Sequence, residues 1–363
     1  MASSSSSPQV LCASFNQDNS FFAIGTRDGF RIFEAHNGRL RYERTIGAFS
    51  IVEMLFSSSL LAIVGAGEQP SLSPRRLCLF NIVSGAALRE LNFLTSIMAV
   101  RFNRKRLVVV LQDKTYIYDL NSMSMLEEID TAPNTKGLCA FAPGSEGCYL
   151  ALPASMTRGS VLIYNTLELQ SLCQIDAHHS PLAAMVFSSN GKFLATASEQ
   201  GTIVRVHLVS QATKSYSFRR GTYSSTIYSL SFGLSLDLPD ILVATSSSGS
   251  LHIFFLDTLL NGRRRHSKLL SSMIPDSIND AFEPPNHHVL HKVVPAGVKS
   301  CITIFSTENA QSASTLSALR ASILVITYNG YFREYTLNVT QSLESSFSLE
   351  REFNLLDTIS DAS

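Results

Sequence analysis

The sequence predicts an all-β protein that folds as a single-domain, seven-bladed β-propeller with a long loop in its sixth blade. A unit of apolar strand, polar turn and alternating strand recurs seven times along the 363 residues. The turns of the first six units follow one another at intervals of 39–48 residues, close to the roughly 40–45 residues of a propeller blade. Helical periodicity is almost absent, whereas the period-two alternation typical of strands is frequent.

The seven units follow in order from the N-terminus. Most of them have a glycine at the bend, as expected for β-hairpins. They span residues 22–33, 60–80, 107–118, 149–164, 194–205, 242–254 and 323–335. The last turn follows the sixth by 81 residues, which places extra chain in blade six. The spacing is of WD40 type, although the chain has no tryptophan and therefore no Trp-Asp dipeptide.

The composition indicates one folded domain with two short tails. Hydrophobic residues make up 45% of the chain and charged residues 16%, a balance typical of a folded protein. We expect the propeller to span residues 10–356, between a disordered Ser-rich N-terminus at 1–9 and a disordered tail at 357–363. The formal net charge is zero, which argues against long-range attraction to nucleic acid.

The sequence also predicts a cytoplasmic protein whose membrane contacts are peripheral. The N-terminus lacks the apolar core of a signal peptide, and Ala2 stands where myristoylation requires glycine. No apolar run approaches the roughly 18 residues that a transmembrane segment needs. The six cysteines form no C-x-x-C pair, so we expect free thiols. We expect a monomer.

Two adjacent arginines, Arg219 and Arg220, are the most informative residues of the chain. They lie in the stretch 215–224, which is predicted to be a strand that ends in a turn at Gly221. Successive side chains of a strand point to opposite faces, so the two arginines would serve two different ligands. Arginine is suited to phosphate because its planar, permanently charged guanidinium donates two parallel hydrogen bonds. The alternative interpretation is a solvated basic pair in a turn.

The segment 218–222 with 227–232 resembles the signature of the PROPPIN family, seven-bladed propellers that bind polyphosphoinositides and act in autophagy. Residues 177–181 and 194–205 resemble the fifth blade of the family, and residues 242–254 resemble its sixth blade. Residues 15–18 and 23–26 resemble its first blade. The resemblance implies a peripheral adaptor on preautophagosomal, endosomal or vacuolar membranes. It also implies recognition of phosphatidylinositol 3-phosphate and phosphatidylinositol 3,5-bisphosphate, and recruitment of autophagy proteins through other blades.

The chain repeats one pattern on blades five and six: Ser, a turn with Gly, Ser or Thr, and then a basic residue. This repetition predicts two head-group sites. The first would contain His178, Ser198, Thr202, Arg205 and Arg219. The second would contain Arg220, Thr222, Thr226, Ser247, Ser250 and His252. Taken singly, such hydroxyls usually bond local backbone and such histidines usually pack in the core.

The extra chain of blade six, residues 257–285, is predicted to contact the membrane. The family places an equivalent loop in the membrane, and here basic and apolar side chains lie together, a composition suited to the lipid interface. The residues are Arg263, Arg264, Arg265, Lys268, Leu269, Leu270, Met273 and Ile274. The alternatives are a flexible solvated loop and a phosphorylated regulatory segment.

Enzyme, cofactor and metal motifs are missing. The patterns G-x-S-x-G, H-E-x-x-H and G-x-x-x-x-G-K-[ST] do not occur. From these missing motifs we expect no cofactor and no catalysis. His287, His288 and His291 have no Cys or carboxylate at metal-binding spacing, so we also expect no metal. A second class of function stays open, in which the propeller only scaffolds proteins and the arginine pair reads an acidic peptide.

Overall fold

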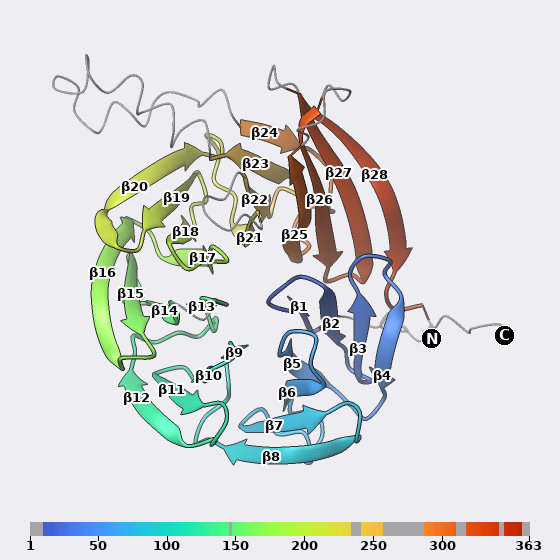
Figure 1. Cartoon of the computed structure of the whole chain (residues 1–363), viewed down its shortest axis with the longest axis vertical. Coiled ribbons are helices and arrows are strands. Elements are labelled where there is room, and N and C mark those ends of the chain that lie inside the picture. Colours follow the sequence, from blue (N-terminus) through green and yellow to red (C-terminus); the bar gives the residue numbers. More distant parts are fainter. Residues whose placement is uncertain are drawn as a thin grey trace, which may run out of the picture.

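The computed structural model describes residues 10–144, 147–233, 241–256, 287–309, 317–340 and 345–357. Within these ranges 28 strands form seven antiparallel four-stranded sheets around a central axis (Figure 1). The prediction of an all-β, seven-bladed propeller is therefore confirmed. In the described ranges, no helix is long and apolar enough to cross a bilayer. All six cysteines have free thiols.

Each blade is built from four strands that are consecutive in the sequence. The first strand lies next to the axis and the fourth at the rim (Figure 1). Blade one comprises β1 (Cys12–Phe15), β2 (Phe21–Gly25), β3 (Phe30–Glu34) and β4 (Leu40–Arg44). Blade two comprises β5 (Phe49–Met54), β6 (Leu60–Gly65), β7 (Arg76–Asn81) and β8 (Ala86–Asn92). Blade three comprises β9 (Ala99–Phe102), β10 (Arg106–Val110), β11 (Lys114–Asp119) and β12 (Met125–Asp130).

The other four blades follow the same order. Blade four comprises β13 (Ala140–Phe141), β14 (Tyr149–Pro153), β15 (Gly159–Asn165) and β16 (Gln170–His178). Blade five comprises β17 (Leu182–Phe187), β18 (Phe193–Ser198), β19 (Ile203–Leu208) and β20 (Gln211–Arg219). Blade six comprises β21 (Ile227–Phe232), β22 (Ile241–Ser246), β23 (Leu251–Phe255) and β24 (His287–Leu290). Blade seven comprises β25 (Ser300–Asn309), β26 (Ser317–Thr327), β27 (Tyr331–Thr340) and β28 (Ser345–Asn354).

The blades are held together by apolar side chains at every interface between neighbours. Seven clusters of buried residues occur in the described structure, one for each pair of adjacent blades. The second strand of a blade is buried on both faces, as in β18 and β22, whereas the outermost strand, as in β8, is mostly exposed. Phenylalanine supplies the largest buried side chains of a chain without tryptophan, among them Phe22, Phe218 and Phe332.

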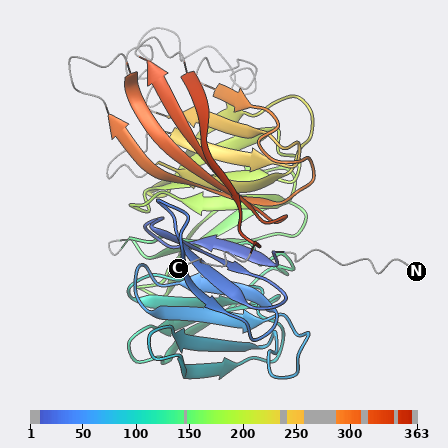
Figure 2. The ribbon, with the colours of Figure 1, turned by 90° about the vertical axis from the view of Figure 1, so that its right-hand side faces the viewer.

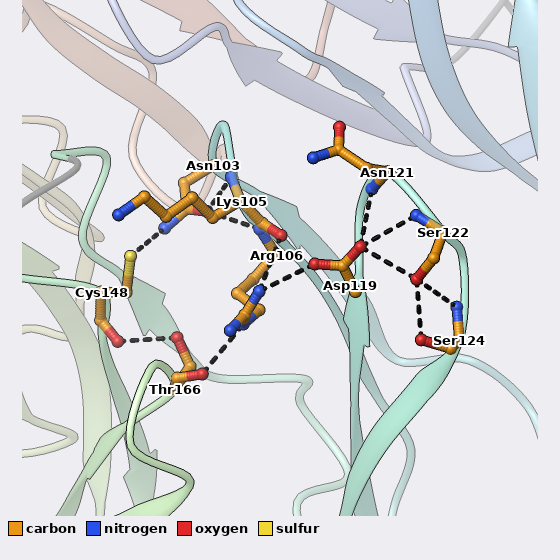
Figure 3. A network of polar contacts seen from close by, with 9 residues as sticks. All are labelled: Asn103, Lys105, Arg106, Asp119, Asn121, Ser122, Ser124, Cys148 and Thr166. Atoms are coloured by element: carbon orange, nitrogen blue, oxygen red, sulfur yellow. Dashed lines mark hydrogen bonds and ion pairs between the residues drawn. The ribbon is translucent and has the colours of Figure 1, made fainter.

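A polar network reinforces the contact between blades three and four (Figure 3). Arg106 of β10 donates from Nε to the Thr166 carbonyl at 3.0 Å and from Nη1 to Asp119 at 3.0 Å. Asp119 also accepts hydrogen bonds from the turn that follows it, at Asn121 and Ser122. These bonds to the turn, together with the Arg106 charge, hold the pKa of Asp119 below its ordinary value. The ion pair of Arg106 and Asp119 thus has two effects: Asp119 fixes the turn of blade three, and Arg106 fixes the contact with blade four.

The ring closes between blades seven and one by side-chain packing. Phe22 of β2 stacks on Phe332 of β27 with 5.1 Å between ring centroids, and Phe332 stacks on Phe353 at 4.7 Å. The Arg31 guanidinium donates to the Leu355 carbonyl at 3.2 Å. In the side view of Figure 2, blade seven, in red and orange, lies directly above the blue strands of blade one. The described strands of both blades pair only within their own sheets. We call this contact the seam.

Truncation at the seam tests how much the ring depends on it. Phe332→Ala is expected to lower the free energy of unfolding by about 3–5 kcal/mol, because it removes a fully buried ring between two aromatic partners. Denaturant unfolding followed by circular dichroism measures the change. Leu349→Ala is the matched control in the same blade, where the side chain is 51% exposed and the cost should stay within about 0.5 kcal/mol. Equal effects of the two substitutions would contradict a seam that depends on packing.

Candidate functional site

The two arginines lie where the chain passes from blade five to blade six. Arg219 is the last residue of β20 and pairs with Ile203 of β19. The preceding Phe218 is 1% exposed and packs in the cluster between blades five and six. Because neighbouring side chains of a strand alternate, Arg219 lies on the opposite face, toward blade four. The predicted strand and its end before the turn are confirmed.

Neither arginine has a carboxylate partner within 4.0 Å among the described residues. The half-buried Arg219 guanidinium makes no hydrogen bond to any residue that the structure describes. Six other strand arginines of this protein behave differently, since each of the six forms an ion pair with a carboxylate. These pairs are Arg31–Glu43, Arg76–Glu90, Arg101–Glu53, Arg106–Asp119, Arg333–Glu352 and Arg351–Glu334. The positive charge of the pair Arg219 and Arg220 is thus not neutralised by any carboxylate of the described residues.

A first polar cluster lies between blades four and five, and we call it site 1. The Arg205 guanidinium approaches Nδ1 of His178 at 3.5 Å and donates to the Ala177 carbonyl and, at 3.2 Å, to Ser217. His178 closes β16, so it reaches site 1 from the outermost strand of blade four. The segment 177–181, which resembles the fifth blade of the family, thus contributes its histidine from blade four. Arg205 pairs with Ser217, which lies two residues before Arg219 on β20. Paired residues share a face, and so do residues two apart on one strand, so Arg205 and Arg219 lie on the same face of blade five.

The imidazoles of site 1 are neutral hydrogen-bonding groups. Nε2 of His178 lies 3.0 Å from the Thr196 hydroxyl, which lies 3.2 Å from Nε2 of His207. Burial, with the nearby Arg205 charge, lowers the pKa of His178 to about 3 and that of His207 to about 4. The cationic charge of site 1 at neutral pH therefore comes from Arg205 and Arg219, and His178 lies in hydrogen-bonding reach of Arg205.

The remaining predicted residues of site 1 border a tight turn. Ser198 ends β18 and is 5% exposed, and Thr202 follows the turn. The Thr202 carbonyl accepts hydrogen bonds from the backbone amides of Arg220 at 2.8 Å and Gly221 at 3.4 Å. Gly201 has a φ of 62°, and a Cβ there would lie 1.9 Å from the Ser225 carbonyl oxygen, so only glycine fits. The turn of blade five thereby positions the arginine pair directly.

A second polar cluster lies between blades five and six, and we call it site 2. Arg220 donates from Nε to the Gly201 carbonyl at 2.7 Å and from Nη2 to the Tyr223 carbonyl. Nδ1 of His252 lies 3.1 Å from Nε2 of His287. Burial lowers the pKa of His252 to about 3 and that of His287 to about 4, and the Arg220 charge contributes to both shifts. Arg220 thus faces the histidines of blade six, while Arg219 faces blade four.

Hydroxyl groups line the turn of blade six next to these histidines. The Ser246 hydroxyl lies 2.9 Å from that of Ser248 and 3.5 Å from Nε2 of His252. The Ser250 hydroxyl lies 3.3 Å from Nδ1 of His291, and that of Ser247 lies 3.0 Å from the hydroxyl of Ser225. Gly249, with a φ of 79°, leaves no room for a Cβ, which would lie 2.1 Å from the Val294 carbonyl oxygen.

Strand register shows which residues of the repeated Ser–turn–basic pattern occupy equivalent positions in blades five and six. Arg205 pairs with Thr196 in blade five, and His252 pairs with Ala244 in blade six. Thr196 lies two residues before the end of β18 and Ala244 two before the end of β22, so the two basic residues occupy equivalent positions. The same register makes Ser246, rather than the predicted Ser247, the counterpart of Ser198. The turn of blade six is one residue shorter, which explains why the basic residue comes earlier there.

Other predicted residues lie at the edges of site 2 or outside the described residues. Thr222 is exposed in the turn after Arg220. Thr226 donates to the Glu199 carbonyl at 3.4 Å and lines a cavity of about 690 Å³ on the central axis, which also contacts Lys136 and Lys299. The predicted membrane-contact residues of the 257–285 loop lie outside the described residues.

Besides Ser246 and Ser248, four residues of the two sites were not predicted from the sequence: Thr196, His207, His287 and His291. Thr196 and His207 alternate with the buried alanines and valines of β18 and β19, and that alternation is the signal that could have found them. His287 and His291 were considered only as metal ligands. Pairing of β23 with β24 brings them beside His252 and Ser250. The described residues contain no group of three or more side chains that could hold a metal ion.

The buried histidines set an acid limit on stability. Their folded pKa values of about 3–4 lie below the ordinary 6.5, so the unfolded chain binds more protons between these limits. The contribution of these histidines to the free energy of unfolding should therefore be at its maximum above pH 6.5 and decrease as the pH falls toward 4. Urea unfolding at pH 7, 6 and 5 measures this slope. His178→Gln should reduce the slope, and an unchanged slope in this variant would refute the assignment.

Comparison with known proteins identifies the family. The sequence model of the PROPPIN family matches residues 9–342. Autophagy-related protein 18b of Arabidopsis thaliana is 62% identical over 360 residues, covering 98% of each chain. Autophagy-related protein 18 of Dictyostelium discoideum is 35% identical over 368 residues, covering 96% of this chain and 94% of that one.

Solved structures support the same fold. Hsv2 of Kluyveromyces lactis, in a structure with a complete loop 6CD, superposes with a TM-score of 0.74 at 19% identity, covering 96% of this chain and all (100%) of that one. KlAtg21, solved in complex with the coiled-coil of AgAtg16, superposes with a TM-score of 0.71 at 21% identity, covering 96% of this chain and 99% of that one. With the match over residues 9–342 and the high identity to a full-length relative, the chain belongs to the PROPPIN family of autophagy-related β-propellers.

Proposed function

We propose that this protein is a non-enzymatic, peripheral membrane adaptor that binds phosphatidylinositol 3-phosphate and phosphatidylinositol 3,5-bisphosphate during autophagosome formation. The observation that carries the proposal is the pair Arg219 and Arg220, which lack carboxylate partners among the described residues and face two different blade interfaces. Each interface adds neutral imidazoles and hydroxyls, which donate to phosphate oxygens. A scaffold that used the pair to bind an acidic peptide is the competing function.

We expect the protein to attach to the membrane through two head groups at once, because sites 1 and 2 lie on one stretch of chain. Arg219 serves site 1 with Arg205 and His178, and Arg220 serves site 2 with His252 and neighbouring serines. A membrane offers many head groups in one plane, so the second head group binds at a high effective concentration once the first is held. Two modest affinities then combine into stable attachment. The membranes would be preautophagosomal, endosomal or vacuolar.

Other blades are available for protein partners. KlAtg21, which has the same fold, forms a complex with a coiled-coil. We infer that this chain likewise recruits autophagy proteins while sites 1 and 2 hold lipid. The candidate is the segment 74–76 of blade two, Pro-Arg-Arg, which resembles a segment through which the family binds such partners. Arg76 there is paired with Glu90, and the preceding Arg75 is exposed.

Removing both arginines tests lipid recognition. Arg219→Thr with Arg220→Thr is expected to abolish flotation with liposomes that contain phosphatidylinositol 3-phosphate, because each site loses a charge-assisted bond worth roughly 10- to 150-fold in affinity. The circular dichroism spectrum should stay unchanged, since both side chains are only partly buried. Arg89→Thr, an exposed arginine of β8, is the matched control and should bind normally. Normal flotation of the double variant would refute the proposal and leave the scaffold.

Single-site variants test whether the sites act independently. Arg205→Ala should disable site 1 and His252→Ala site 2, because each side chain belongs to one cluster only. Each variant should bind soluble inositol 1,3-bisphosphate at about half the wild-type stoichiometry in calorimetry and lose most of its liposome affinity. Complete loss of soluble binding in both variants would instead indicate one composite site.

A further inference from the structure

Tyr223 is a nearly fully exposed aromatic residue between the two sites. Its side chain is 86% exposed, and only three residues separate it from Arg219. Among the exposed large hydrophobic residues of the described structure, Val83 and Leu94 are comparably exposed, at 84% and 91%, but both lie on blade two. A single exposed apolar residue is ordinary on a protein surface. The surroundings of Tyr223 are what set it apart.

The turn that carries Tyr223 is fixed at both ends. The Arg220 guanidinium donates to the Tyr223 carbonyl, and the backbone amide of Arg220 donates to the Thr202 carbonyl at 2.8 Å. On the other side, the Ser224 hydroxyl and the Ser225 amide both donate to the Gln200 carbonyl, each at 3.1 Å. The backbone therefore holds the ring in solvent, and little chain entropy remains to be lost when the ring binds something.

The same turn is the stretch of chain that connects site 1 to site 2. It begins at Arg219 and Arg220, and at its end the Ser225 hydroxyl lies 3.0 Å from that of Ser247 on the turn of blade six. A surface that supplied one phosphate to each arginine would therefore lie near this turn, since the turn begins at both arginines. Thr222 and Ser224, which flank Tyr223, are also exposed and polar. An aromatic ring with a polar hydroxyl, set among hydroxyl groups, matches the boundary between head groups and acyl chains.

We propose that Tyr223 is a membrane-contact residue, which enters the lipid interface when sites 1 and 2 hold head groups. This inference rests on the proposed function and adds to it a contact that no soluble head group would use. Its role would be to add apolar contact to the lipid phase, so that the protein distinguishes a bilayer that displays phosphoinositides from the same phosphates free in solution. The apolar contact complements the electrostatic one, because it does not weaken with salt.

The absence of tryptophan from the chain makes insertion directly observable. Tyr223→Trp introduces a single tryptophan at the proposed contact, and Leu94→Trp introduces one at an equally exposed position on blade two. With liposomes containing phosphatidylinositol 3-phosphate, emission of the Tyr223→Trp variant should shift to the blue and be quenched by brominated acyl chains. Emission of the Leu94→Trp variant should do neither. Equal responses of the two variants, or no response from either, would overturn the proposal.

Affinity measurements separate this inference from the function on which it rests. Tyr223→Ala should weaken liposome binding about three- to tenfold and leave calorimetric binding of soluble inositol 1,3-bisphosphate unchanged. Leu94→Ala should change neither quantity. A parallel loss of soluble binding would make Tyr223 part of the head-group sites and overturn the proposal. If wild-type protein binds neither liposomes nor inositol phosphate, the proposed function fails. If it binds both and Tyr223→Ala matches it, only the membrane contact fails.

Discussion

Closure of the ring is the constraint on which the rest of the structure depends. Blades seven and one meet through the stacked rings of Phe22 and Phe332 and through the Arg31 bond to the Leu355 carbonyl. Their described strands pair only within their own sheets. The seam therefore relies on the same apolar packing as the other blade interfaces. Since every blade touches two neighbours, a loss at any interface loosens the whole circle.

Both candidate sites depend on this closure because each is divided between two blades. Site 1 joins His178 of blade four to Arg205 of blade five, and site 2 joins Arg220 to His252 of blade six. The distance across each site is thus set by how blades pack, with Phe218 wedged between blades five and six. The packing of the blades also sets the charge of the two sites, because it buries their histidines. Because burial keeps the histidines neutral, the positive charge of the two sites, among the residues that the structure describes, comes from the arginines.

Local periodicity was sufficient to predict the hairpins, the number of blades and the strand that carries Arg219, because each depends on residues close in sequence. What could not be predicted depends on chain geometry over longer distances. The pairing of β24 with β23 brings His287 to His252 across more than thirty residues. A turn one residue shorter makes Ser246, not Ser247, the counterpart of Ser198. The stack of Phe22 on Phe332 follows only from a closed ring. The predicted contacts of the 257–285 loop stay a prediction.

The seam also has a consequence for how the chain folds. Hairpins within a blade join residues close in sequence, whereas the bond from Arg31 to Leu355 spans 324 positions. Loop-closure entropy makes such long-range contacts slow to form, so we expect the blades to form first and the circle to close last. Until then, blades one and seven present complementary apolar faces to solvent. Two open chains at high concentration therefore have a route to pair with each other, seam to seam, as an exchanged dimer that buries the same aromatic stack.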